Sequence, residues 1–306
     1  MTIRHLKIFI AVVETGKMST AAAQCYISEP TVSQAVRELE EHYGVLLFER
    51  IGKKLYITEA GKNLFAYARM LVNQFDELED NMLKGFSEKL RIGGTITVGS
   101  CIMPQLINQY HKIKPQVETS VYINNTKSIE EKLLKSELDI GIVEGKIKSR
   151  DLVAVPMIND YLVIVCSKNH RFSGCSSISV KDLEKECFVM REEGSGTREL
   201  FENYISRCGA NINIKWEVTC PDMMKKVVIM NNCLAAISAR LVEEEAKKGL
   251  LYVIKSSGQA LNRYFSLVYY KNKFVNDNMK SLMYLLEEYK DEDILSGIST
   301  GTLMDI

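Results

Sequence analysis

The stretch that most constrains this chain lies near its start, where two helix-forming segments are separated by only four residues. Segments 20–26 and 31–42 have helical periodicity, but the intervening residues 27–30 read ISEP. The Ser28 hydroxyl can accept from free backbone N–H groups at a helix start. Pro30 suits the first helical turn, because its missing N–H costs nothing there. Two short helices joined by a tight turn are therefore predicted, with Ala22, Ala23 and Tyr26 facing inward from the first helix.

The second helix of this pair carries a polar face that is typical of a DNA-reading helix-turn-helix. After it, Gly52 and two lysines separate two short β-prone runs, which indicates a hairpin wing suited to phosphate or minor-groove contacts. The candidate DNA-binding residues on the helix and the wing are Ser28, Pro30, Thr31, Ser33, Gln34, Arg37, Arg50, Lys53 and Lys54.

Charge composition gives no support of its own to DNA binding. The whole chain carries 39 basic and 39 acidic side chains, and residues 1–60 carry seven of each. The strongly basic footprint of many DNA-binding domains is absent. An ordinary helical domain with a tight turn is therefore the alternative interpretation of residues 1–60.

A resemblance favours the DNA-binding interpretation. The segment AAAQCYISEPTVSQAVRELEEHYGVLLFERIGKKLYITEAG resembles the N-terminal signature of LysR-type transcriptional regulators. The matching residues are Ala22, Ala23, Ile27, Ser28, Pro30, Ser33, Leu39, Glu40, Gly44, Leu47, Phe48, Arg50, Thr58, Ala60 and Gly61. The family's usual glutamine before the proline is Glu29 here. The resemblance implies a homodimer or homotetramer that binds double-stranded promoter DNA at two inverted half-sites and can contact RNA polymerase.

Residues 59–90 are predicted to form a linker helix that pairs two copies of the chain. Leu64, Leu71 and Leu78 are seven residues apart, and Phe75 belongs to a second row offset by four. Such a spacing is typical of a coiled-coil seam. The alternative is a helix that packs within its own domain. We expect Gly93 and Gly94 to mark the end of this region.

From residue 95 onward, short apolar runs alternate with helical stretches, which predicts parallel sheets covered by helices. Residues 96–99 are the first expected strand of this pattern. The resemblance implies that this part is a two-lobed, α/β, periplasmic-binding-protein-like effector domain. The predicted division is an all-α winged helix-turn-helix at 1–58, the linker helix at 59–90 and the effector domain at 91–306. Lobe I spans about 91–163 and 267–290, lobe II about 164–266, and residues 291–306 are a possible tail.

The candidate effector site lies where strands are expected to hand over to helices, because ligands of open α/β sheets bind at the carboxyl ends of strands. Helix N-termini there favour an anion. The loop RxxGSGTR at 191–198 also resembles that of LysR-type regulators of sulfur and carbon assimilation, in which it lines the effector cleft. The candidate residues are Ser100, Cys101, Met103, Glu144, Gly194, Ser195, Gly196, Thr197, Arg198 and Met223. Arg198 can instead pair with Glu202, one turn on.

Several alternatives accompany this interpretation. Cys101 beside a helix start could act as a redox-sensing thiol. An enzyme or a solute-binding protein is less favoured, since no catalytic spacing is legible and no residues are assigned to catalysis, a cofactor or a metal. The eight cysteines have no CxxC spacing and are expected to be mostly buried free thiols. No run of 18 apolar residues is present, so we expect a cytoplasmic protein without a membrane partner.

Overall fold

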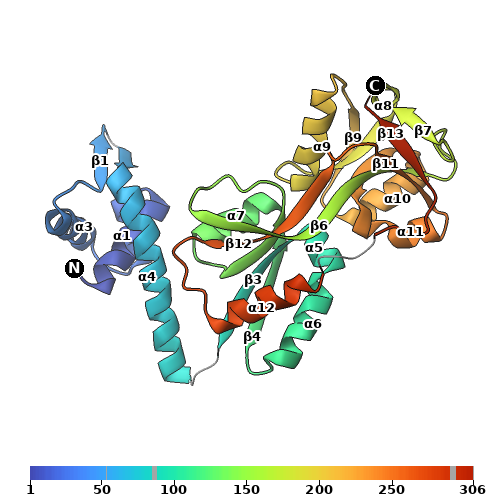
Figure 1. Cartoon of the computed structure of the whole chain (residues 1–306). Helices are drawn as coiled ribbons and strands as arrows, with labels where there is room; N and C mark the ends of the chain where they lie inside the picture. Colours follow the sequence, from blue (N-terminus) through green and yellow to red (C-terminus); the bar gives the residue numbers. More distant parts are fainter. Residues whose placement is uncertain (53, 85–87, 290–293, 306) are drawn as a thin grey trace. The chain divides into compact units, whose positions relative to one another are not determined.

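The computed structural model describes residues 1–52, 54–84, 88–289 and 294–305. It contains two compact units (Figure 1). The first comprises Met1–Glu88 with Leu134–Ser136, and the second comprises Lys89–Leu133 with Glu137–Ile306. No helix in the described part of the chain combines the length and apolar character that crossing a membrane requires.

The first unit is a winged helix-turn-helix followed by a long helix. Its elements are α1 (Ile3–Thr15), α2 (Met18–Gln24), α3 (Glu29–Tyr43), β1 (Phe48–Ile51), β2 (Lys54–Ile57) and α4 (Glu59–Lys84). Gly16 and Gly44 end α1 and α3 in the left-handed conformation, which glycine adopts without steric cost. The predicted helix pair and wing are confirmed. Ala22 is buried, but Ala23 and Tyr26 do not face inward as predicted. Ala23 is exposed, and the φ of 55° at Tyr26 turns that side chain outward and leaves it 95% exposed.

Two apolar clusters hold the first unit together. One joins Ile8 and Val12 of α1 to Val32 and Val36 of α3. The other joins Leu6 and Phe9 of α1 to Leu39, Leu47, Ala68 and Val72. Helix α4 is therefore anchored to the helix-turn-helix by its first half.

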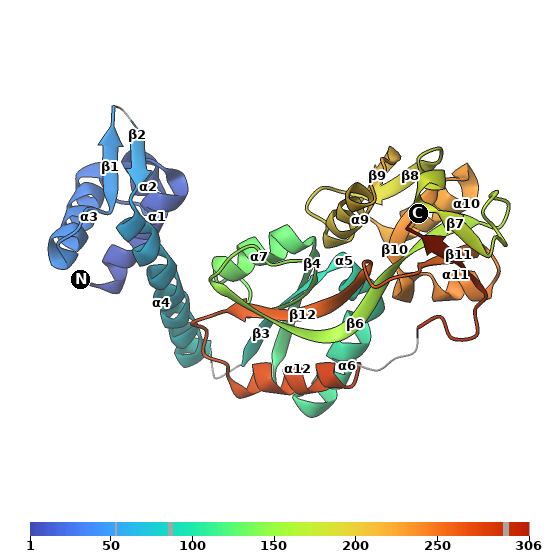
Figure 2. The same ribbon diagram turned by 45° about the horizontal axis from the view of Figure 1, so that its top comes forward.

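The second unit contains one continuous sheet that runs through two lobes (Figure 2). Lobe I is built from β3 (Lys89–Thr95), β4 (Glu118–Asn124), β5 (Ile140–Glu144), β12 (Asn262–Tyr270) and the first half of β6 (Leu152–Ser167). Its strand order is β4-β3-β5-β12-β6. Its helices are α5 (Ile96–Cys101), α6 (Met103–Ile113), α7 (Thr126–Leu134) and α12 (Asp277–Glu287).

Lobe II continues the sheet from the second half of β6 in the order β10-β8-β9. Its strands are β7 (Ser177–Ser179), β8 (Cys187–Arg191), β9 (Asn213–Val218), β10 (Leu234–Ser238), β11 (Leu251–Ser256) and β13 (Thr300–Met304). Its helices are α8 (Val180–Leu183), α9 (Gly196–Arg207), α10 (Pro221–Asn231), the 3-10 turn Ala239–Leu241 and α11 (Glu243–Lys247). Helices α9 and α10 cover opposite faces, because alternate residues of β8 and β10 enter two separate cores.

Three expectations about the second unit are wrong. Residues 96–99 were expected to form a strand, but they lie in α5, and the first strand is β3. Gly93 and Gly94 are therefore inside a strand, where a Cβ on Gly93 would lie 2.7 Å from the Leu138 side chain. The region 291–306 is not a loose tail where it is described: β13 pairs in parallel with β11 and β7.

Candidate DNA interface and lobe junction

The start of α3 is organised as its sequence predicted. Ser28 has extended backbone geometry, and its Oγ accepts from the Thr31 backbone N at 3.4 Å. The two hydroxyls of Ser28 and Thr31 lie 2.8 Å apart. Pro30 occupies the first helical turn. These three residues are exposed, so they are available to a partner that approaches this helix end.

The polar face of α3 continues over the next two turns. Gln34 and Arg37 are exposed and Ser33 is half-buried. Gln34 Nε2 donates to Glu38 Oε1 at 2.9 Å, which holds the amide along the helix surface. Thr31, Gln34 and Arg37 follow one another at helical spacing and form one face, as expected for a helix that enters a groove.

A hollow of about 300 Å³ lies between the wing and the start of α2. Three cationic residues, Lys17, Arg50 and Lys54, contribute to its lining, together with Glu29. Sequence reasoning missed Lys17, which is the N-cap residue of α2. Lys53 lies outside the described residues. Cationic side chains beside a helix start suit the oxygens of a phosphate group.

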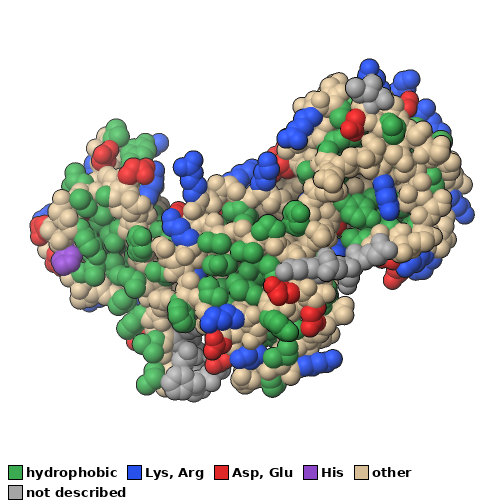
Figure 3. Space-filling model, in the orientation of Figure 1, with side chains coloured by type: hydrophobic (Ala, Val, Ile, Leu, Met, Phe, Trp, Pro, Cys, Tyr) green, Lys and Arg blue, Asp and Glu red, His purple; other side chains and the backbone are tan. Residues whose placement is uncertain are grey.

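Basic side chains are scattered on the face of the molecule that Figure 3 shows, where Lys and Arg are spread over both units and do not gather in one stretch. Arg37 on α3 adds an exposed cation outside the hollow.

The predicted seam of α4 divides into two parts. Leu64 is half-buried and packs into the unit's own core, next to the fully buried Ala68. Phe75 is also half-buried, with the Lys7 ammonium 5.8 Å from its ring centroid. Leu71 and Leu78 are 44% and 55% exposed. An apolar stripe thus remains on the surface of α4, formed by Tyr67, Leu71, Leu78 and Met82.

The lobe junction of the second unit holds a buried carboxylate at the end of β5. Glu144 is 2% exposed. Its Oε1 accepts from the Thr97 hydroxyl at 3.0 Å, and its Oε2 accepts from the Thr95 hydroxyl. Thr126 Oγ1 donates to the Glu144 backbone oxygen at 2.7 Å. The ends of β3, β4 and β5 therefore meet at one polar centre, as the parallel sheet predicts.

A second polar centre joins the strands that connect the two lobes. Arg263 of β12 donates from Nε to Asp160 Oδ2 of β6 at 2.7 Å. Ser238, at the end of β10, donates to Asp160 Oδ1 at 2.7 Å. Arg263 Nη1 also donates to Thr197 Oγ1 of α9 at 2.9 Å. This ion pair is buried, so it needs all of these bonds to offset desolvation.

Two donors at this junction lack a hydrogen-bond partner among the described residues: Ser195 Oγ and Arg263 Nη2. Ser195 is 2% exposed and is the N-cap residue of α9, yet its side chain makes no cap bond. Arg263 is 8% exposed. A buried donor without a partner costs free energy, so an acceptor from outside the chain would be favoured here.

The glycine-rich loop brings the lobes into close approach. Gly194 has a φ of 85°, which favours glycine. A Cβ on Gly196 would lie only 2.7 Å from the Glu144 backbone oxygen, so no larger residue fits without movement. Beside this contact opens a cavity of about 340 Å³ whose lining includes Lys146, Gly196, Arg207 and Arg263. Three cations and one acid, Glu199, thus line one hollow at the junction.

Several candidate effector residues are placed elsewhere. Ser100 is exposed in α5, and its hydroxyl donates to the Ile96 backbone oxygen at 2.9 Å. Met103 is 3% exposed in the core of lobe I, and Met223 is 53% exposed on α10. The first strand ends at Thr95, five residues before Ser100, which is why the first junction was misplaced.

Arg198 and Cys101 also differ from expectation. Arg198 donates to Glu202 at 2.8 Å and to Glu217 at 2.6 Å, so the alternative pairing with Glu202 is confirmed. Cys101 lies at the end of α5, not at a strand-to-helix junction, and donates to the Thr97 backbone oxygen. Burial, together with the carboxylates of Asp160 and Glu144, raises the pKa of Cys101 to about 12. That disfavours the reactive thiolate.

The polar residues that sequence reasoning missed are Thr95, Thr97, Asp160, Ser238 and Arg263. One signal was legible: Asp160 interrupts the apolar run of β6, and a charge in a buried strand needs a partner. The sequence did not reveal the identity of that partner, since Arg263 lies 103 residues further along the chain.

Comparison with known proteins finds matches to the same family in both parts of the chain. Residues 84–290 match the family described as LysR substrate binding domain, and residues 3–62 match the bacterial regulatory helix-turn-helix protein, lysR family. The RuBisCO operon transcriptional regulator of Allochromatium vinosum is 30% identical over 276 residues, which cover 89% of this chain and 91% of the relative. The transcriptional activator CmpR of Synechocystis sp. is 28% identical over 275 residues, 89% and 90% of the two chains. A full-length OxyR variant from Pseudomonas aeruginosa has the same fold, with a TM-score of 0.65, 21% identity and 94% of each chain covered.

Proposed function

The chain belongs to the LysR family of transcriptional regulators, and we propose that its regulated step is the binding of a small anionic metabolite at the lobe junction. The observation that carries this proposal is the pair of buried, unpartnered donors, Ser195 Oγ and Arg263 Nη2. Both lie at the junction, one at the start of α9 in lobe II and one at the start of β12 in lobe I. A carboxylate or a similar oxyanion supplies the acceptors that these donors lack.

Ligand titration of the full chain tests this proposal. A thermal-shift screen of small carboxylates, phosphates and inorganic anions selects a ligand, and calorimetry measures its affinity. Ser195→Ala deletes one donor, so binding should weaken by about 1–3 kcal/mol. Ser100→Ala is the matched control, because the Ser100 hydroxyl bonds within its own helix. Equal loss in both variants, or no loss in Ser195→Ala, would contradict this assignment.

For promoter DNA, we propose that α3 reads bases through Thr31, Ser33, Gln34 and Arg37 while Lys17, Arg50 and Lys54 hold the backbone. Their exposure and the cationic hollow support this. Lys54→Ala should weaken binding to all sequences and reduce the salt slope by about 0.9 for each phosphate that is no longer neutralised. Lys62→Ala, which removes an exposed cation from α4, should leave the slope unchanged. A Lys54→Ala slope equal to that of wild type would argue against the wing contact.

For assembly, we propose that α4 pairs two copies of the chain through Tyr67, Leu71, Leu78 and Met82. Their exposure on a helix anchored by its other face supports this. Leu71→Asp should halve the mass measured by light scattering, since pairing would bury a charge without a partner. Phe274→Asp changes an even more exposed apolar side chain in the second unit and should leave the mass unchanged. A Leu71→Asp protein of wild-type mass would exclude this helix as the pairing surface.

A further inference from the structure

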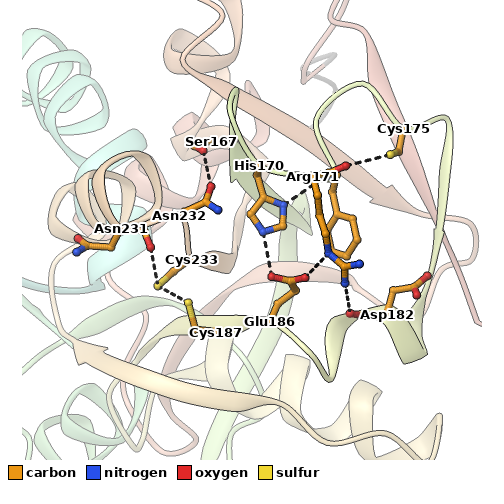
Figure 4. Close-up of polar contacts among 11 residues, drawn as sticks. Ser167, His170, Arg171, Cys175, Asp182, Glu186, Cys187, Asn231, Asn232 and Cys233 are labelled. Atoms are coloured by element: carbon orange, nitrogen blue, oxygen red, sulfur yellow. Dashed lines mark hydrogen bonds and ion pairs between the residues drawn. The ribbon is translucent and has the colours of Figure 1, made fainter.

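We propose that Cys187 and Cys233 form a reversible intramolecular disulfide bond by exchange with a low-molecular-weight disulfide. The two Sγ atoms lie 2.8 Å apart (Figure 4). Non-bonded heavy atoms rest roughly 3.5–4.0 Å apart, and bonded sulfurs about 2.0 Å apart. The thiols therefore need to approach by less than about one ångström to bond.

Strand pairing sets this distance. Cys187 starts β8, and Cys233 directly precedes β10, its parallel neighbour. In the ladder, Phe188 pairs with Leu234, so the two cysteines stand opposite each other one residue earlier. Neighbouring strands are about 4.8 Å apart, which lies within the Cα separation of roughly 4.4–6.8 Å that disulfides allow. Both cysteines also face the same core, beneath α10.

Each cysteine follows a residue that is anchored to one turn of lobe II. Glu186 accepts from Arg171 Nε at 2.5 Å, and its Oε2 lies 3.2 Å from His170 Nε2. Asn232 accepts from the Ser167 hydroxyl at 3.0 Å and has a φ of 54°. The residues that bind Glu186 and Asn232 belong to the segment 167–171, so these contacts restrain the two strands from separating just before the thiols (Figure 4). These contacts keep the Cys187 and Cys233 thiols close to each other.

The two thiols differ in access. Cys187 is half-buried and Cys233 is 2% exposed. Burial and the neighbouring Cys187 raise the pKa of Cys233 to about 12, against a lowering by Lys215. Cys187 therefore reacts first with the small disulfide, and Cys233 then attacks the resulting mixed disulfide.

The exchange balances as two steps. The Cys187 thiolate attacks one sulfur of the small disulfide, so its S–S bond breaks and one small thiolate leaves with the proton that Cys187 lost. Cys233 then attacks the Cys187 sulfur and expels the second small thiolate, which takes the Cys233 proton. Two protein thiols are oxidised and one small disulfide is reduced to two thiols. The new bond ties β8, which leads into Ser195, to β10, which ends at Ser238.

Oxidised glutathione is the probe for a test on the reduced full chain. Intact mass should fall by two hydrogens, and peptide mapping should find Cys187 linked to Cys233. Cys233→Ser should trap glutathione on Cys187 at least ~10-fold more than wild type, because no resolving thiol remains. Cys220→Ser removes an exposed thiol and should leave the link intact. Failure to trap glutathione, or links spread over other cysteine pairs, would overturn the proposal.

Thermal melting separates a native bond from one made in unfolded chains. The link closes a loop between residues 46 positions apart. Oxidised wild type should melt roughly 5–10 °C above its reduced form, because the cross-link restricts the unfolded chain. Cys187→Ser should show no such shift, and a thiol reductant should reverse it in wild type. A fall in the melting temperature on oxidation would mean that the bond distorts lobe II, which contradicts the proposal.

Discussion

Gln34 and Arg263 belong to the two proposed recognition surfaces, which are built in different ways. Gln34 is exposed on α3, beside Thr31 and Arg37 of the same helix. Arg263 is 8% exposed and bonds to Asp160 and Thr197, which come from β6 and α9. The first surface is local in sequence and stays outside the core. The second is assembled from distant segments and forms part of the core, so its binding groups also support the fold.

The largest effect that this comparison predicts is on stability. Arg263→Met removes one partner of a buried ion pair and leaves the Asp160 charge uncompensated. Unfolding free energy should fall by about 3–5 kcal/mol in denaturant titration of the full chain. A loss of unfolding free energy under ~1 kcal/mol would show that the junction does not support the fold, and the contrast between Gln34 and Arg263 would no longer hold.

Acid titration should expose a second buried link between distant segments. Asp139 accepts from Arg91 Nη2 at 2.7 Å and from Lys273 Nζ at 2.5 Å. Burial raises the pKa of Asp139, but the bonds and charges of Arg91 and Lys273 outweigh it, so the pKa is lowered. A lowered pKa stabilises the fold above the unfolded value of about 4, and this is lost as pH falls through the folded value.

The matching variant is Asp139→Asn. It should cost about 1.5–3 kcal/mol at neutral pH, since hydrogen bonds to charged groups are lost. The difference from wild type should begin to shrink below about pH 4, because the unfolded wild-type carboxyl takes up a proton there, and it should be lost once the folded carboxyl is also neutral. A difference that stays constant with pH would assign the loss to packing and not to charge.

On the exposed surface, a change in binding should leave the fold unchanged. Gln34→Ala should reduce discrimination between cognate and scrambled DNA by about 1–3 kcal/mol, while unfolding free energy changes by less than ~0.5 kcal/mol. Competition binding and denaturant titration measure the two quantities on one preparation. Parallel losses in both would mean that α3 does not separate recognition from stability.

The smallest effect should come from Arg198, which sharpens the contrast with Arg263. Arg198 bonds to Glu202 and Glu217, whose side chains are 43% and 56% exposed. Water screens such pairs, so Arg198→Met should cost only ~0–1 kcal/mol. Ligand affinity should not change, because the guanidinium is already engaged by these two carboxylates. A large loss of ligand affinity in Arg198→Met would show that Arg198 belongs to the ligand site.

The same contrast explains what could be predicted from sequence. The turn before α3 was predictable because Ser28, Pro30 and Thr31 act within one helical turn. Ser195 and Thr197 could be predicted at the lobe junction because a glycine-rich loop indicates that two backbone segments approach closely. Asp160 and Arg263 were not found, since their pairing depends on strand order. The helix α5 was mistaken for a strand because its first residues are β-branched or apolar, whereas packing inside lobe I decides its conformation.

The position of β12 also affects how the chain folds during synthesis. This strand lies between β5 and β6, and each of its paired residues is more than a hundred positions after its partner in the sequence. The first unit and most of lobe II have left the ribosome before residue 270 does, whereas the sheet of lobe I still lacks a central strand. Until then β5 presents an open edge, which is prone to pair with other chains. We therefore expect nascent chains truncated before residue 262 to require chaperones, and folding of lobe I to be the slow step of biogenesis.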